Sequence, residues 1–167
     1  DDVSSIRQLV DLTARIQGMA RVTRPVPPWV HGFVVAKYRH GRAASTPVRP
    51  LGWSFPWQAR VSSQASAADT EEASRIWGRR WRTVGLHVLP VPMLNVPTFP
   101  VGIMRDTWHD GDAEAIAAQG AAIVRGLERA RCGSMGSHFP IHGATPDDSH
   151  QVVPVIEMPY DDAREHR

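Results

Sequence analysis

Residues 83–104 read TVGLHVLPVPMLNVPTFPVGIM and carry no Asp, Glu, Lys or Arg side chain. About 20 apolar residues are long enough to cross a bilayer as a helix. The prolines at 90, 92, 97 and 100 lack a backbone donor and prevent a regular helix. Backbone carbonyls without donors are too costly in hydrocarbon. We therefore predict that the stretch is extended, apolar and covered by protein.

The chain is predicted to be one domain, or a small domain with a long extension, because it has 167 residues. Residues 12–68 hold eight cationic side chains and no acid, whereas residues 106–167 hold eleven acids and five arginines. A basic first half and an acidic second half indicate two different environments or partners. Cys132 is the only cysteine, which excludes an internal disulfide. The start at Asp1, without Met, is expected of a processed product.

Three segments show the periodicity of amphipathic helices, over residues 3–19, 70–84 and 112–130. Asp2 or Ser4 is expected to cap the first helix, and Asp69 or Thr70 the second. Gln151–Glu165 is a candidate short helix interrupted by prolines. The fold class predicted is mainly α, a small helical protein with long irregular Pro/Gly-rich connections. The predicted apolar faces are Ile6, Leu9, Val10, Ile16 and Met19; Ala73, Ile76, Trp77, Trp81 and Val84; and Ala113, Ile116, Ala117, Gly120, Ile123, Val124 and Leu127.

Candidate chemistry gathers after the third helix. Cys132, His138 and His142 with Asp147 offer ligands of the kind that bind zinc, but their spacing matches no known finger. Ser134 or Cys132 with His138 offers a nucleophile and a base, without the local sequence of known hydrolases. We therefore expect no catalytic residue, no metal and no cofactor. In the alternative interpretation of these residues, the histidines belong to an ordinary loop.

Nucleic-acid binding is a second candidate function. Residues 12–68 alternate arginine with aromatic side chains, which suits contacts to phosphate and stacking on bases. A mitochondrial ribosomal or other RNA-binding structural protein has such a composition. The acidic second half argues against this function.

Several short motifs occur in the order found in one known family. They are Gly102-Ile103-Met104-Arg105-Asp106, Glu114-Ala115-Ile116, Val153-Pro154-Val155-Ile156-Glu157 and the charged tail from Asp161 to Arg167. In this order they resemble the 14 kDa subunit, or ubiquinone-binding protein, of the mitochondrial cytochrome bc1 complex. The resemblance covers residues 102–167. It divides the chain into an N-terminal extension over 1–101 and a helical region over 102–167.

The resemblance implies a non-catalytic accessory subunit of respiratory complex III on the matrix side of the mitochondrial inner membrane. Its implied partners are cytochrome b and the core subunits, and its role is assembly and stability, with no spanning helix of its own. The expected docking residues are Gly102, Met104, Arg105, Asp106 and Trp108. Alternatively, Arg105 and Asp106 only cap the next helix.

Overall fold

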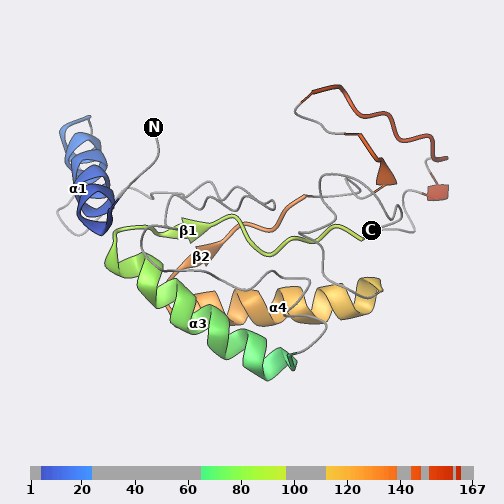
Figure 1. The fold of residues 1–167 in the computed structure, drawn as a ribbon, viewed down its shortest axis with the longest axis horizontal. Coiled ribbons are helices and arrows are strands. Elements are labelled where there is room, and N and C mark those ends of the chain that lie inside the picture. Colours follow the sequence, from blue (N-terminus) through green and yellow to red (C-terminus); the bar gives the residue numbers. More distant parts are fainter. Residues whose placement is uncertain are drawn as a thin grey trace.

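The computed structural model describes residues 5–23, 65–96, 112–138, 144–147, 151–159 and 161–162. These residues form three helices and a two-stranded parallel sheet, in the order α1 (Ile6–Thr23), α3 (Ala67–Thr83), β1 (Val88–Leu89), α4 (Ala113–Arg129) and β2 (Gly133–Ser134). Figure 1 shows α3 and α4 together below the two strands, with α1 apart from them. The prediction of a mostly helical chain is confirmed at this level, but the parallel sheet was not expected.

Helix α3 begins at a capping box. The Ser66 hydroxyl accepts the backbone N–H of Asp69 at 3.1 Å, and the Asp69 carboxylate accepts the backbone N–H of Ser66 at 3.2 Å. This exchange satisfies two donors that a helix start leaves without partners. The expected cap at Asp69 or Thr70 was therefore wrong, because Asp69 is the third helical residue. The helix ends at Thr83, and Gly85 follows with φ of 85°, a left-handed value that favours glycine.

Helix α4 agrees closely with its predicted range of 112–130. The Asp112 carboxylate accepts the backbone N–H of Ala115 at 2.9 Å, and Ala130 is the C-cap. Ala113 and Ala117 were expected on the apolar face but are exposed. The buried face of α4 comprises Ile116, Gln119, Gly120, Ala122, Ile123, Gly126 and Leu127.

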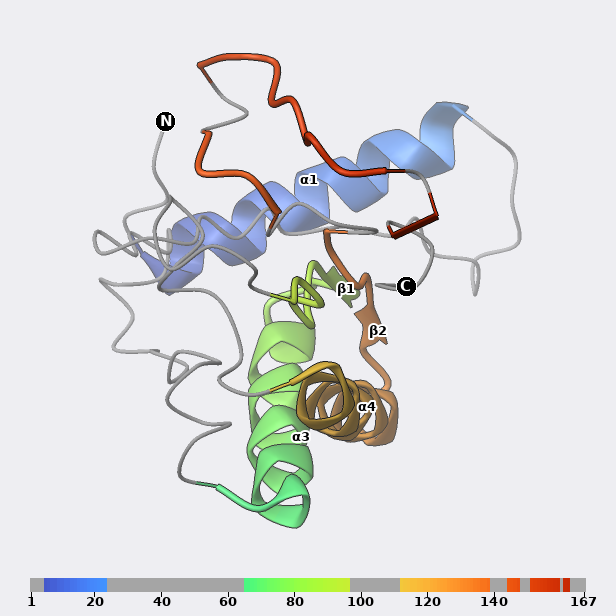
Figure 2. The same cartoon turned by 90° about the vertical axis from the view of Figure 1, so that its right-hand side faces the viewer.

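Helices α3 and α4 pack closely because small residues lie at their contact. A Cβ atom on Gly126 would lie 2.7 Å from the Cβ of Ser74, and one on Gly78 would lie 2.8 Å from the Cβ of Ala130. Figure 2 shows α4 nearly end-on against the side of α3. Ile76 was predicted on the apolar face of α3 but is 44% exposed, because glycine and serine positions rather than Ile76 face α4.

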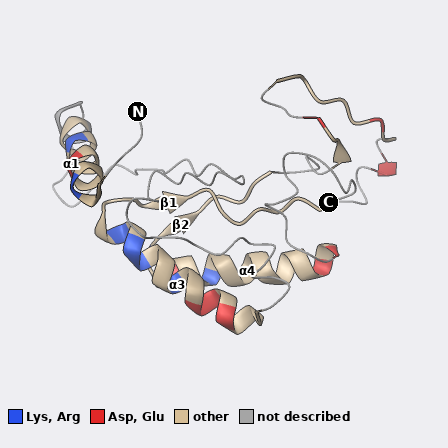
Figure 3. Cartoon of the chain, viewed as in Figure 1, with Lys and Arg blue, Asp and Glu red and all other residues tan. Residues whose placement is uncertain are grey.

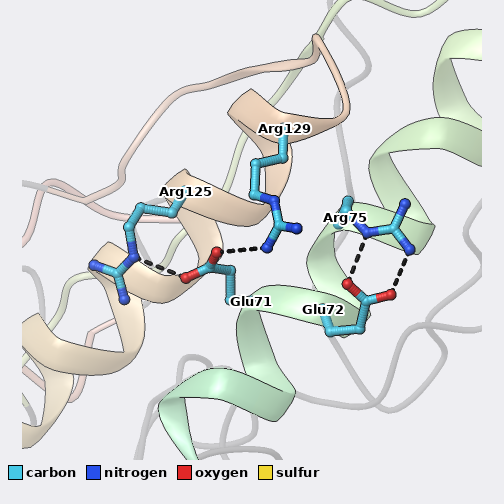
Figure 4. Close-up of polar contacts among 5 residues, drawn as sticks. All are labelled: Glu71, Glu72, Arg75, Arg125 and Arg129. Atoms are coloured by element: carbon cyan, nitrogen blue, oxygen red, sulfur yellow. Dashed lines mark hydrogen bonds and ion pairs between the residues drawn. The ribbon is translucent and has the colours of Figure 1, made fainter.

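Ion pairs join α3 and α4 at their solvent-exposed surface. The Glu71 carboxylate accepts hydrogen bonds from Arg125 and Arg129, each at 2.9 Å, and Glu72 pairs with Arg75 within α3 (Figure 4). The bonds from Arg125 and Arg129 hold the pKa of Glu71 below its ordinary value. Figure 3 shows acidic residues at the starts and basic residues at the ends of α3 and α4, which complements both helix dipoles.

Within the uncharged stretch, residues 86–96 follow the turn at Gly85 and are extended and largely buried. β1 pairs in parallel with β2, with Val88 opposite Gly133 and Leu89 opposite Ser134, and α4 forms the crossover between the strands. The prediction of an extended and covered segment is confirmed for these residues. Their cover belongs to the same chain, since one core cluster joins Leu9, Trp77, Trp81, Val84, Leu86, Leu89, Val91, Ile123, Leu127, Ala130 and Cys132.

Helix α1 contacts this core through a narrow strip. Leu9 and Thr13 are buried, and the Thr13 hydroxyl donates to the Val84 carbonyl at 2.7 Å. The predicted apolar face is wrong apart from Leu9, because Ile6, Val10, Ile16 and Met19 are at least 41% exposed. The described helix begins at Ile6, three residues later than predicted, and the Ser5 hydroxyl accepts the backbone N–H of Gln8 at 3.1 Å. The predicted caps Asp2 and Ser4 lie outside the described residues.

The predicted helix over Gln151–Glu165 does not form across residues 151–159, which are irregular, and the other described residues of this range, 161–162, are helical. Pro154 and Pro159 have no N–H to donate within a helix, which accounts for the difference. No helix in the described part of the chain combines the length and the apolarity that a membrane span requires.

Candidate functional site

The candidate site lies at the carboxyl end of the two parallel strands. Beyond β1 and β2 the backbones remain paired through a parallel bridge between Met93 and Ser137. The Leu94 N–H donates to the Ser137 carbonyl at 2.7 Å, and the Ser137 N–H donates to the Pro92 carbonyl at 3.0 Å. This pairing brings Asn95 to His138. Ligands of parallel α/β folds bind at the carboxyl ends of strands, so we take this edge as the candidate site.

Asn95 and His138 form the polar pair of this edge. The Asn95 side chain is 1% exposed, and its Oδ1 accepts the backbone N–H of His138 at 3.2 Å. The other end of the amide, Nδ2, lies 3.4 Å from Nδ1 of the His138 ring. His138 itself is exposed. The arrangement presents an imidazole, anchored by a buried amide, to a ligand.

The backbone around this pair is irregular. The peptide bonds Val91–Pro92 and Ser137–His138 are both cis. The Ser137 hydroxyl donates to the Met93 sulfur at 3.5 Å. Side-chain and backbone hydrogen bonds therefore both join residues 92–95 to residues 137–138.

Cys132, one of the two predicted nucleophiles, belongs to the core. It is 2% exposed, and its Cβ would lie 3.4 Å from a Cβ on Gly78 of α3. Burial raises the pKa of its thiol to about 11, and the nearby Arg82 lowers it only in part. A protonated, buried thiol is a poor nucleophile. Ser134, the other candidate, is half-buried in β2.

The predicted metal ligands are not brought together as far as the structure describes them. Within the described ranges no group of three or more His, Cys, Asp or Glu side chains is placed to hold a metal ion. Cys132 is buried in the core, while the backbone N–H of Asp147 donates to the Thr145 hydroxyl at 3.2 Å. His142 lies outside the described residues.

The five expected docking residues, Gly102, Met104, Arg105, Asp106 and Trp108, also lie outside the described residues and stay predictions. His138 was named as a candidate base and metal ligand, whereas Asn95 was missed. The position of Asn95 in the sequence was the signal that could have identified it. It is the only asparagine of the sequence, and it follows nine uncharged residues from Leu86 to Leu94.

Comparison with known proteins identifies the fold to which this edge belongs. The family described as "Glycosyl hydrolase family 3 N terminal domain" matches this chain over residues 33–167, about four-fifths of its length. The chain belongs to glycosyl hydrolase family 3. The match includes both strands, α3, α4 and the Asn95–His138 pair.

Individual relatives and solved structures agree with this assignment. A beta-hexosaminidase of Nitrosospira multiformis is 31% identical over 160 residues, covering 94% of this chain and 44% of the relative. A solved fungal multi-domain family 3 β-N-acetylglucosaminidase has a TM-score of 0.79 at 24% identity, over 98% of this chain and 19% of the other. NagZ from Neisseria gonorrhoeae, in complex with N-trifluoroacetyl-D-glucosamine, has a TM-score of 0.71 at 19% identity, over 96% of this chain and 47% of the other. The chain thus spans less than half the length of these relatives.

The family 3 assignment overturns the resemblance to the complex III subunit. The match over 33–167 includes every motif that carried the resemblance, so those motifs belong to a glycosidase fold. The expectations of a non-enzymatic subunit, of cytochrome b and core subunits as partners, and of the ribosomal alternative were therefore wrong. Motifs of three to five residues, such as Met104-Arg105-Asp106, are too short for their order alone to identify a fold. The mitochondrial location and the division at residues 101 and 102 stay predictions.

Proposed function

We propose that this chain is part of a glycoside hydrolase that cleaves β-linked N-acetylhexosamines. The observation that carries the proposal is the 31% identity to a beta-hexosaminidase across 94% of the chain. The family 3 β-N-acetylglucosaminidases with the same fold support the choice of sugar. The carboxyl edge of β1 and β2 is the part of the described chain that faces the substrate in this proposal.

His138 contributes a hydrogen bond to the sugar in the proposed enzyme. Its ring is exposed at the carboxyl edge, and Asn95 anchors it from the buried side. Glycoside hydrolysis also requires two acidic groups, one of which protonates the leaving oxygen. The full-length protein supplies this pair in the proposal, because family members are more than twice as long as the chain.

The full-length protein tests the proposal with 4-nitrophenyl N-acetyl-β-D-glucosaminide and, for comparison, the β-glucoside. We expect turnover of the N-acetylated substrate, and a fall in kcat/KM of about tenfold or more in His138→Ala, because one bond to the sugar is lost. His87→Ala is the matched control. His87 precedes β1 at the opposite end of the strands, and its carbonyl bond to Gly133 is kept. A full-length protein that turns over neither substrate would contradict the proposal.

A further inference from the structure

Helix α3 carries a row of charged side chains along one side. Side chains three or four positions apart share one side of a helix. The charged residues of α3 with this spacing are Glu71, Arg75, Arg79 and Arg82. At the start of the row the charges are paired (Figure 4). The Glu71 carboxylate accepts from Arg125 and Arg129 of α4, and both oxygens of Glu72 accept from Arg75.

The other end of the row has no such pairing. Arg79 is exposed and Arg82 is half-buried. Arg131 is exposed and follows Ala130, whose Cβ would lie 2.8 Å from a Cβ on Gly78, the residue before Arg79. Within the described residues, Arg79, Arg82 and Arg131 form no ion pair with a carboxylate. We call these three residues the arginine cluster.

The backbone at Arg131 has a conformation that glycine adopts more easily. Helix α4 ends in a Schellman motif, because the Cys132 N–H donates to the Leu127 carbonyl at 2.9 Å. The Arg131 N–H donates to the Glu128 carbonyl at 2.8 Å, and Arg131 has a left-handed φ of 56°. A side chain is disfavoured there relative to glycine, and residues held in such regions cluster at functional sites. A contact of the Arg131 side chain with a partner would account for an arginine at this position.

The paired start of the row indicates which chemistry the arginine cluster fits. A guanidinium group has N–H donors in a fork that matches the two oxygens of a carboxylate, as Arg75 and Glu72 show. Arginines one helical turn apart match carboxylates spaced about 5–6 Å apart, which is the spacing of acidic residues on one side of a helix. We propose that the arginine cluster is a docking surface for an acidic peptide segment of another protein.

The position of the arginine cluster makes this surface independent of the proposed substrate site. Helix α3 leads into β1, and Arg131 lies just before β2, so the cluster is at the amino ends of the two strands. Figure 3 shows the basic end of α3 beside the start of β1. The candidate site is at the opposite, carboxyl edge. The inference therefore does not rest on the proposed function.

Fluorescence anisotropy of a labelled peptide tests the proposal on the full-length protein. The probe is a helical peptide with glutamate at every fourth position, and the same peptide with glutamine instead is the uncharged control. We expect only the glutamate peptide to bind, and more weakly at high salt. Arg79→Ala should raise its Kd about threefold, as expected for the loss of one exposed ion pair. Arg15→Ala removes the same charge from an exposed position of α1 and should leave the Kd unchanged.

Arg131→Gly separates peptide binding from stability. Loss of the side chain should raise the Kd about threefold. Glycine at a φ of 56° should at the same time raise the melting temperature, measured by circular dichroism. A side chain that serves only the fold would give the opposite result, a lower melting temperature with an unchanged Kd.

Three outcomes would overturn the proposal. The first is a glutamate peptide that does not bind, and the second is a native Kd in Arg131→Gly and Arg79→Ala. The third concerns inorganic polyphosphate, the competing probe, because guanidinium groups also bind phosphate. If polyphosphate binds more tightly than a glutamate peptide of equal charge, and the arginine variants weaken it, the surface fits a phosphate polymer and not an acidic peptide.

Discussion

Helix α1 and the α3–α4 pair have similar lengths and apolar periodicity but different surroundings. All three helices have 17 or 18 residues and an apolar face. In α4 that face is buried, with Leu127 fully covered, whereas Ile16 of α1 is 41% exposed. Periodicity therefore predicts a helix well, but it does not say how much of the apolar face finds a partner.

The difference arises from what each helix contacts. Gly78 and Gly126 let the α3 and α4 backbones approach closely, because a side chain at either position would meet the other helix. Helix α1 has one buried leucine and one hydroxyl bond from Thr13 to Val84. Close approach thus provides the contact area that amphipathicity alone does not.

Truncation of one apolar side chain in α4 and of one in α1 is expected to give the largest difference in stability. Leu127→Ala should lower the free energy of unfolding by about 2–5 kcal/mol, because it leaves a cavity in a packed core. Ile16→Ala removes a partly exposed side chain and should cost less than about 1 kcal/mol. Urea unfolding followed by circular dichroism measures both. Equal losses would show that the exposed face of α1 is covered by another part of the protein.

Replacement of a glycine by alanine in α4 and in α1 is expected to give the next largest difference in stability. Gly126→Ala places a Cβ against Ser74 and the α3 backbone, so we expect a net loss of about 1–3 kcal/mol despite the better helix propensity of alanine. Gly18→Ala meets nothing within 4 Å and should gain about 0.5–1 kcal/mol. Thermal unfolding of the two variants gives the sign of each change. A stabilised Gly126→Ala protein would contradict the close approach of α3 and α4.

Removing the charge that joins α3 and α4 should have the smallest effect. Glu71 has a lowered pKa, so its ion pairs contribute stability above the ordinary glutamate pKa near 4.5, and this contribution is lost as the pH falls through the folded pKa. Glu71→Gln should therefore flatten the fall in melting temperature below about pH 4.5. The difference from native should shrink in high salt, since both arginine side chains are at least 52% exposed. A difference that persists unchanged at low pH and high salt would argue for a role of Glu71 other than ion pairing.

Local sequence signals predicted the helices within a few residues. The bounds of α4 follow from the cap at Asp112, and the end of α3 from Gly85. Helix α1 ends just before the Arg24-Pro25 pair that predicts a stop. These signals act within one or two turns of the chain, which is why one sequence is enough to find them.

The sheet and the candidate site were harder to predict. Strands of two residues are too short for a period-2 pattern, so the extended stretch before Asn95 was recognised without its partner strand. His138 was named for its chemistry, but its partner Asn95 is 43 residues away in sequence. The sequence predicted that protein covers the uncharged stretch, but not that α3 and α4 of the same chain provide this cover.

The sequence by itself determined that α1, α3 and α4 are helical and that residues 86–96 are extended, because caps, prolines and apolar periodicity act on neighbouring residues. Only the tertiary structure decided that residues 87–95 run parallel to residues 133–138. That pairing depends on α4 crossing over the strands and packing against α3 through Gly126. The Asn95–His138 pair follows from this arrangement, because parallel neighbours meet only after a long connection has brought them together.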